Sequence, residues 1–237
     1  MTVRADSAGP LRFWVGAFGV RVEVVAAPPA GAVLASLLAG LSLGPGRVSA
    51  VLSLASGADG WSLREGAGPP LAESPDWHAP GEALLVRLNA LLLAAAPLLA
   101  VHAGVVRLPG GGVLAMPAES GTGKSTMTAA LVQAGAAYVS DEALVLDRGL
   151  VVTAYPRPLL LAADRASALG LGVSVLRAAE VAYPPASLGP AVTAGEPLRL
   201  RHVVRLLRRP GPVSLARLPG LDSAPLVLED AFIHFED

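Results

Sequence analysis

The first 95 residues alternate short apolar runs with turn-forming residues, a pattern typical of a small α+β domain. Residues 11–26 carry β-branched and aromatic side chains in loose alternation around a glycine, which predicts a β-hairpin. The apolar positions of residues 30–41 have helical spacing, whereas 47–55 and 61–65 have the pattern of two strands around a turn. Residues 64–82 are rich in proline, so we expect a connection without regular structure.

The apolar segment 83–101 could be a membrane helix or a buried helix. Arg87, Asn89 and Pro97 interrupt it. The apolar run that remains is shorter than the roughly 20 residues that a membrane-spanning helix needs. We therefore predict a buried amphipathic helix that closes an N-terminal domain at residues 1–95.

From residue 96 the pattern changes to strands that alternate with loops and helices. Residues 101–108 and 112–117 predict two strands on either side of a glycine-rich turn. A helical run then begins near residue 124, and Gly135 suits its C-cap. The following apolar runs predict one strand that ends at an acidic pair and a hairpin with an Asp-Arg-Gly turn.

The last part of the chain predicts a shorter series of elements. We expect a helix near 165–171, a proline-rich loop over 183–197, and two strands at 200–207 and 213–218. The basic stretch 201–209 favours an exposed edge strand over an anion-binding site. The fold class is therefore α/β, with a second domain at 96–237 that contains a mixed sheet with helices.

Composition excludes several classes of function. The chain has 237 residues and a formal net charge of -1, and its mostly scattered arginines do not form the basic surface of a nucleic-acid-binding protein. Because cysteine is absent, disulfides, thiolate zinc sites and a cysteine nucleophile are excluded. The N-terminal residues do not resemble a secretory signal peptide, and we expect a cytoplasmic protein.

The segment Ala-Glu-Ser-Gly-Thr-Gly-Lys-Ser at 118–125 matches the P-loop pattern G-x-x-x-x-G-K-[ST], except that Ala118 replaces the first glycine. Gly121 and Gly123 can adopt positive φ and turn successive backbone N–H groups inward. The helix that follows adds the positive end of its dipole, which favours a phosphate. The alternative is an ordinary glycine-rich turn between a strand and a helix.

Lys124 is the only lysine of the chain, and it occupies the one motif position that requires a compact ammonium group. We expect it to reach the β and γ phosphates of ATP, while the Ser125 hydroxyl binds Mg²⁺. The sequence does not distinguish ATP from another nucleoside triphosphate. The residues predicted to bind the nucleotide within this loop are Ala118, Glu119, Ser120, Gly121, Thr122, Gly123, Lys124, Ser125 and Thr126.

Acidic residues end two of the apolar runs that follow the P-loop. Asp141 and Glu142 end the first run, and Asp147 ends the second. Either position could supply the carboxylate that acts beside a P-loop. Asp147 directly precedes Arg-Gly, which favours a hairpin-turn role for it over a functional one.

His102 lies within an otherwise apolar strand, where a histidine is more often a hydrogen-bonded core residue than a catalytic one. The wider pattern changes this balance. Residues 101–106, the P-loop with its flanking strand and helix, and the segment Tyr-Val-Ser-Asp-Glu together resemble the kinase domain of the HPr kinase/phosphorylase family. The resemblance covers about residues 98–160 and is closer to HPr-kinase-related proteins of bacterial peptide-modification gene sets.

The resemblance implies a P-loop HPr-kinase-like fold and a role for each matching residue. His102 would lie near the transferred phosphate, Asp141 would accept the proton of a serine hydroxyl, and Glu142 would help to hold Mg²⁺. Arg157, between two prolines, matches a Pro-Arg-Pro segment of related kinases and would contact a phosphate or a substrate carboxylate, with a solvated loop arginine as the equal alternative. The later signature of phosphorylase activity is not found, so the reverse reaction is not expected.

These observations predict an ATP- and Mg²⁺-dependent kinase that phosphorylates a hydroxyl group, with serine on a peptide or small protein as the expected acceptor. Two alternatives are a nucleotide-binding switch or assembly factor without an acceptor, and a kinase of free serine or a similar metabolite. The expected partners are the nucleotide and the acceptor, with neither nucleic acid nor a membrane, and self-association into a homo-oligomer is left open.

Overall fold

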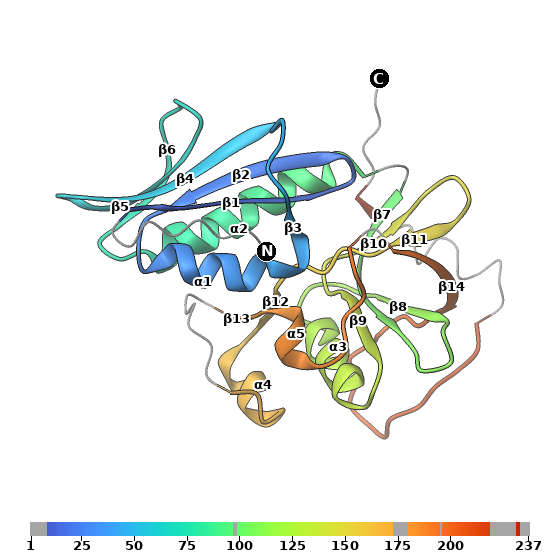
Figure 1. The fold of residues 1–237 in the computed structure, drawn as a ribbon. Helices are drawn as coiled ribbons and strands as arrows, with labels where there is room; N and C mark the ends of the chain where they lie inside the picture. Colours follow the sequence, from blue (N-terminus) through green and yellow to red (C-terminus); the bar gives the residue numbers. More distant parts are fainter. Residues whose placement is uncertain (1–8, 97–98, 173–179, 195, 219–230, 233–237) are drawn as a thin grey trace. The chain divides into compact units, whose positions relative to one another are not determined.

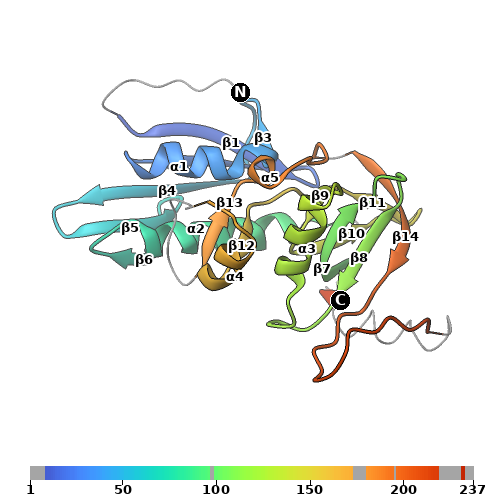
Figure 2. The same ribbon diagram turned by 90° about the horizontal axis from the view of Figure 1, so that it is seen from below.

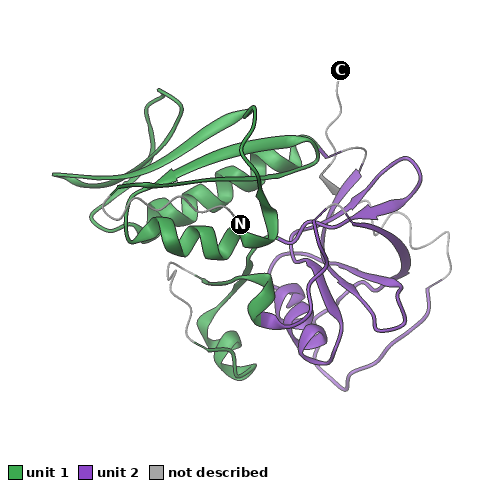
Figure 3. Ribbon diagram, in the orientation of Figure 1, with its two compact units in different colours: residues 1–95, 157–187 green, residues 96–156, 188–237 purple. Residues whose placement is uncertain are grey.

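The computed structural model describes residues 9–96, 99–172, 180–194, 196–218 and 231–232 (Figure 1). Its helices and strands form a mixed α/β fold. The chain divides into two compact units (Figure 3). Unit 1 comprises Met1–Ala95 and Arg157–Ser187, and unit 2 comprises Ala96–Pro156 and Leu188–Asp237.

The division differs in one respect from the two domains expected at 1–95 and 96–237. The first boundary lies after residue 95, but residues 157–187 group with unit 1. Within this returning segment, β12 (Leu159–Leu161) pairs with β13 (Val181–Tyr183) in a separate two-stranded sheet. These two strands therefore do not extend the sheet of unit 2.

Unit 1 is built on a six-stranded sheet with the order β3-β1-β2-β4-β5-β6. Two α-helices lie along one face of this sheet (Figure 1). The strands are β1 (Leu11–Ala17), β2 (Val20–Ala26), β3 (Ser42–Leu43), β4 (Ala50–Gly57), β5 (Gly60–Glu65) and β6 (Pro70–Ser74). The helices of this unit are α1 (Ala30–Leu37), the 3-10 turn η1 (Leu38–Leu41), α2 (His78–Leu93), α4 (Ala163–Ala168) and α5 (Pro185–Leu188), which ends at the unit boundary.

The predicted hairpins of unit 1 are confirmed. Strands β1 and β2 pair around Phe18 and Gly19, which both have positive φ, and β4 pairs with β5. The stretch 64–82 was expected to lack regular structure, and this is wrong, because it contains β6 and the start of α2. Proline is tolerated at Pro70 because it is the first residue of an edge strand.

The apolar segment 83–101 divides between a helix and a strand. Helix α2 is a buried helix, as predicted, with Leu84, Leu88 and Leu92 spaced four residues apart and almost fully covered. It begins and ends earlier than predicted, and residues 99–101 belong to the next strand. Among the described residues, no helix combines the length and the apolar character needed to cross a membrane.

Unit 2 contains a seven-stranded sheet, and five of its strands close into a ring. Neighbouring strands follow the order β10-β11-β14-β8-β7, and β10 pairs with β7 again. All of these pairs are antiparallel except that of β14 with β8. The strands are β7 (Leu99–Arg107), β8 (Val113–Pro117), β9 (Ala137–Ser140), β10 (Ala143–Leu146), β11 (Val151–Thr153), β14 (Pro197–Val203) and β15 (Ala231–Phe232).

Alternation along β7 separates the core of unit 2 from the face that carries the predicted site. Val101, Ala103 and Val105 belong to the apolar core enclosed by the ring. Because side chains alternate along a strand, His102 and Gly104 lie on the opposite face. Helix α3 (Lys124–Gln133) packs against β7 and β9 (Figure 2).

Gly104 permits this close packing of α3 on β7. A Cβ atom at this position would lie 2.3 Å from the hydroxyl oxygen of Thr128 on α3. The other end of α3 follows the prediction, since Gly135 has φ of 102° and its N–H donates to the carbonyl of Val132. The N–H of Ala136 donates to Leu131, which completes a Schellman C-cap.

The C-terminal predictions were correct for one strand and wrong for another. Strand β14 (Pro197–Val203) overlaps the predicted stretch 200–207 only in residues 200–203, and it lies between β11 and β8, so it is not an edge strand. Its parallel pairing with β8 joins residues far apart in the chain, which local patterns do not indicate. Residues 213–218, predicted as a strand, have no regular secondary structure and are exposed.

Candidate functional site

The loop between β8 and α3 has the backbone form expected of a phosphate-binding loop. Gly121 and Gly123 have φ of 80° and 107°, and a Cβ atom at either position would meet open space. The Thr122 hydroxyl donates to the carbonyl of Glu119 at 2.7 Å, which closes the turn. Positive φ at these two glycines lets backbone N–H groups converge on an anion at the N-terminus of α3.

Ala118 explains why the first glycine of the motif can be replaced. It is fully buried, and it is not among the described non-glycine residues with positive φ. An alanine therefore adds no backbone strain at this position. The departure from the motif does not change the form of the loop.

Lys124 lies inside the loop with only 6% of its surface exposed. Its ammonium group donates to the carbonyl of Glu119 at 2.9 Å and also to the carbonyl of Ala118. These contacts hold the charged group at the concave side of the loop, where a phosphate would bind. Glu119 and Ser120 are exposed, and Thr126 is half-buried.

Asp141 meets the P-loop helix through Ser125. One carboxylate oxygen of Asp141 lies 3.5 Å from the Ser125 hydroxyl, and the other accepts a hydrogen bond from Tyr138 at 3.0 Å. Both Asp141 and Tyr138 are buried, with 5% and 0% of their surfaces exposed. The carboxylate is thus held in one direction at the start of α3.

The acidic pair occupies an interruption between β9 and β10, which lie one after the other along β7. Ser140 is fully buried, and its hydroxyl accepts hydrogen bonds from the N–H groups of Glu142 at 3.2 Å and Ala143 at 3.1 Å. These bonds satisfy two backbone donors where the strand is interrupted. Ser140 therefore shapes the bend that presents Asp141.

His102 contacts the same bend from β7. Its Nδ1 atom lies 3.0 Å from the carbonyl oxygen of Glu142, and the Ala103 N–H donates to that oxygen at 3.2 Å. His102 is half-buried. Unit 2 therefore brings together His102, the acidic pair and the P-loop, while the catalytic roles of these residues remain predictions.

The donor set near Ser125 fits one magnesium ion bound together with a nucleotide. Mg²⁺ prefers oxygen ligands and is held in many nucleotide sites by one or two protein oxygens plus phosphates. The hydroxyl of Ser125 is such a donor, and the carboxylate of Asp141 lies 3.5 Å from it. Glu142 stays the second magnesium ligand that the resemblance predicts. Within the described residues there is no cluster of three or more His, Asp or Glu side chains that could hold a metal ion without the nucleotide.

Two other predicted residues are Asp147, in a turn of unit 2, and Arg157, in unit 1. The Asp147 carboxylate accepts hydrogen bonds from the N–H groups of Gly149 at 2.8 Å and Val151 at 2.9 Å, so its predicted turn role is confirmed. Arg157 is buried and belongs to unit 1, whereas the P-loop belongs to unit 2. Its contact with a nucleotide remains a prediction.

Sequence reasoning did not identify Tyr138 and Ser140 as parts of the site. They lie two residues apart in β9, and the register of β9 on β7 shifts between them. A tyrosine and a serine at alternate positions of an otherwise apolar strand are the signal that could have identified them. Their link to Asp141 depends on the bend after Ser140, which the pattern does not reveal.

No family model, curated protein or solved structure matches this chain.

Proposed function

We propose that this protein is an ATP- and Mg²⁺-dependent kinase of the HPr-kinase-like kind, which phosphorylates a serine hydroxyl on a peptide or small protein. The observation that carries the proposal is the pairing of a phosphate-binding loop with a buried carboxylate. Asp141 lies 3.5 Å from Ser125, the first residue after the P-loop lysine. In this proposal, the metal and the terminal phosphates of the nucleotide bind beside this acidic side chain.

Each residue has a definite task in this proposal. The loop N–H groups and Lys124 bind the phosphates, and Ser125 supplies an oxygen ligand. Asp141 orients the acceptor hydroxyl and accepts its proton, because a serine hydroxyl is a weak nucleophile at neutral pH. When bound, ATP supplies the phosphoryl group and Mg²⁺ neutralises its charge. His102 lies near the transferred phosphate in this proposal, and its ring is held by the contact of Nδ1 with the carbonyl oxygen of Glu142.

The test is phosphate transfer to peptides encoded beside this gene, followed by mass spectrometry. Asp141→Asn keeps the shape of the side chain but removes the proton acceptor, so we expect nucleotide binding to persist and transfer to fall by about 100-fold or more. Lys124→Ala should abolish both. Transfer at the wild-type rate by Asp141→Asn contradicts the mechanism.

The contact between Asp141 and Ser125 also favours a second candidate, a nucleotide-binding switch. In P-loop proteins that hydrolyse nucleotides, the P-loop hydroxyl and an acidic residue hold the metal together. A switch would bind ATP and Mg²⁺ with the same dependence on Lys124 but would label no acceptor. The same mass-spectrometry experiment separates the two, provided that nucleotide binding is first shown by calorimetry.

A further inference from the structure

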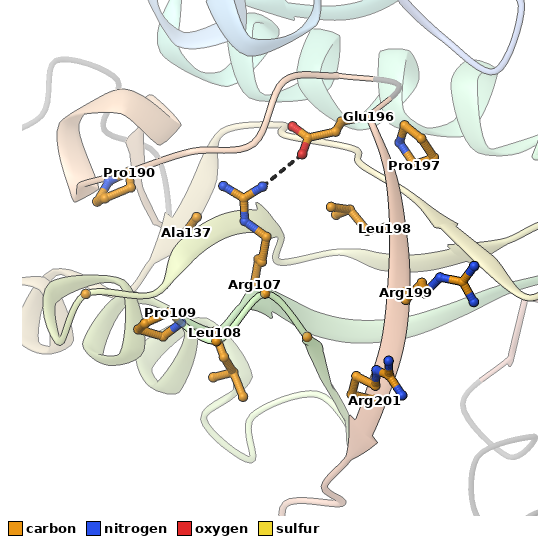
Figure 4. Close-up of a pocket in the computed structure, with 14 residues that line it drawn as sticks. Arg107, Leu108, Pro109, Ala137, Pro190, Glu196, Pro197, Leu198, Arg199 and Arg201 are labelled. Atoms are coloured by element: carbon orange, nitrogen blue, oxygen red, sulfur yellow. Dashed lines mark hydrogen bonds and ion pairs between the residues drawn. The ribbon is translucent and has the colours of Figure 1, made fainter.

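A cleft lies in unit 2, at the opposite end of β8 from the P-loop. It has a volume of about 630 Å³ and is lined by the turn at 110–112, the start of β14 and three arginines (Figure 4). These arginines are Arg107, Arg199 and Arg201, and Glu196 is the only acidic residue in the lining. This volume is of the size that small ligands occupy.

Only one of these arginines is compensated by a carboxylate. Arg107 donates to Glu196 at 2.8 Å (Figure 4). The guanidinium groups of Arg199 and Arg201 make no hydrogen bond or ion pair with any other described residue. In Figure 4 they turn away from the Arg107–Glu196 pair. The lining therefore carries a formal charge of +2 on two groups that are ready to bind oxyanions.

The fold places these two arginines side by side. Leu198 and Leu200 face the core of unit 2, so alternation puts Arg199 on the other face of β14. Arg201 lies at the register shift between Leu200 and His202, and it lines the same cleft as Arg199. Residues 197–199 of β14 pair with β11, and residues 200, 202 and 203 pair with β8, so both arginines lie in a strand that is hydrogen-bonded to its neighbours. Strand β14 overlaps the basic stretch 201–209, for which the sequence favoured an exposed edge strand.

Gly112 makes room for the side chain of Arg201. A Cβ atom at this position would lie 2.7 Å from Cγ of Arg201, so the arginine stem occupies the space that a side chain at 112 would need. The aliphatic stem of Arg201 lies over the turn that precedes β8. A substitution at Gly112 would therefore move Arg201 without changing the charge of the cleft.

We infer that this cleft is an anion-binding site, distinct from the P-loop, for a small ligand with two or more phosphate or carboxylate groups. Arg199 and Arg201 form its binding pair, and each guanidinium can donate two parallel hydrogen bonds to one phosphate or carboxylate group. The five residues of β8 separate the two sites by about 15 Å. Binding here does not rest on the proposed kinase activity.

The test is calorimetric titration with two probes, inorganic pyrophosphate and citrate, in a Lys124→Ala background that weakens binding at the P-loop. We expect one equivalent of at least one probe to bind. Arg199→Ala with Arg201→Ala should weaken binding about 100-fold, since each charge-assisted pair contributes about 10-fold. Pyrophosphate alone indicates a phosphate ligand, citrate alone indicates a carboxylate ligand, and both indicate recognition of charge.

The matched control is Arg208→Ala with Arg209→Ala, which removes the same charge from exposed residues outside the cleft. Its affinity should equal that of the Lys124→Ala parent. Gly112→Ala should weaken binding about 10-fold at constant charge, whereas Gly110→Ala, where a Cβ meets open space, should not. Absence of binding at millimolar probe, equal weakening by both arginine pairs, or unchanged affinity in Gly112→Ala would overturn the inference.

Discussion

At the residue scale, Tyr138 sets the direction of the Asp141 carboxylate. Its hydroxyl donates to one oxygen, which leaves the other facing Ser125. Tyr138 itself is held by backbone hydrogen bonds, because its N–H donates to Pro190 and its carbonyl accepts from Val192. We regard Tyr138 as a positioning residue that acts through Asp141.

Tyr138→Phe removes this hydrogen bond and keeps the buried ring. We expect phosphate transfer to fall about 10-fold, because a hydrogen bond to a charged group contributes about 1.5–3 kcal/mol. The measurement is a double-mutant cycle with Asp141→Asn, read as transfer and as the Mg²⁺ dependence of nucleotide affinity. If Tyr138 acts through Asp141, its substitution has little further effect in the Asp141→Asn background. Equal effects in both backgrounds would show an independent structural role.

Gly104 tests how closely α3 must approach the sheet. Gly104→Ala places a methyl group against the Thr128 hydroxyl, so we expect the free energy of unfolding to fall by about 1–3 kcal/mol. Gly110→Ala is the control, because a Cβ there meets nothing within 4 Å. Denaturant titration of both variants measures the difference. Adding Thr128→Ala should restore part of the loss, and a Gly104→Ala variant as stable as the control contradicts the packing.

At the element scale, the bend between β9 and β10 is the feature on which the site depends. Ser140 lies opposite Val105 and Ala143 lies opposite His102, and the register of β9 on β7 shifts just before Ser140, between Tyr138 and Ser140. The interruption turns Asp141 toward α3, while the Ser140 hydroxyl accepts hydrogen bonds from the N–H groups of Glu142 and Ala143. A single hydroxyl therefore stabilises both the strand connection and the acidic pair.

Ser140→Ala leaves the N–H groups of Glu142 and Ala143 without this acceptor. We expect a loss of about 1–3 kcal/mol in the free energy of unfolding, the usual cost of an unsatisfied buried polar group. Nucleotide-dependent activity should fall together with stability. The matched control is Ser187→Ala, whose hydroxyl makes an exposed hydrogen bond and whose loss should cost no more than about 0.5 kcal/mol. Similar losses in the two variants, measured by denaturant titration, would contradict the role of Ser140.

Local sequence signals were sufficient for the glycine-rich turn between β8 and α3, the hairpins and the C-cap at Gly135, because each depends on residues close together in the chain. Pairings between distant segments were not predictable in the same way. The parallel pair of β14 with β8 and the closure of β10 on β7 need a register that only the folded chain defines. The same limit applies to Tyr138, whose partner Asp141 is reached only because the strand bends after Ser140.

At the scale of the whole molecule, the chain passes between the two units three times. Residues 96–156 of unit 2 are inserted between the two segments of unit 1. The returning segment 157–187 therefore lies between two parts of unit 2 in sequence but belongs to unit 1 by contact. The response of this segment to a ligand at the P-loop shows whether it unfolds with unit 1 or with unit 2.

Hydrogen exchange with saturating ADP and Mg²⁺ measures this response. A ligand at 100 times its Kd stabilises the unit that binds it by about 2.7 kcal/mol, which slows exchange through unfolding of that unit about 100-fold. We expect this slowing at the amides of β7 and β8, and no change at β4, β12 and β13, because they belong to unit 1. Lys124→Ala should remove the effect. Slowing of β12 and β13 together with β7 would assign the returning segment to unit 2, and equal slowing at every strand would show that the units unfold as one.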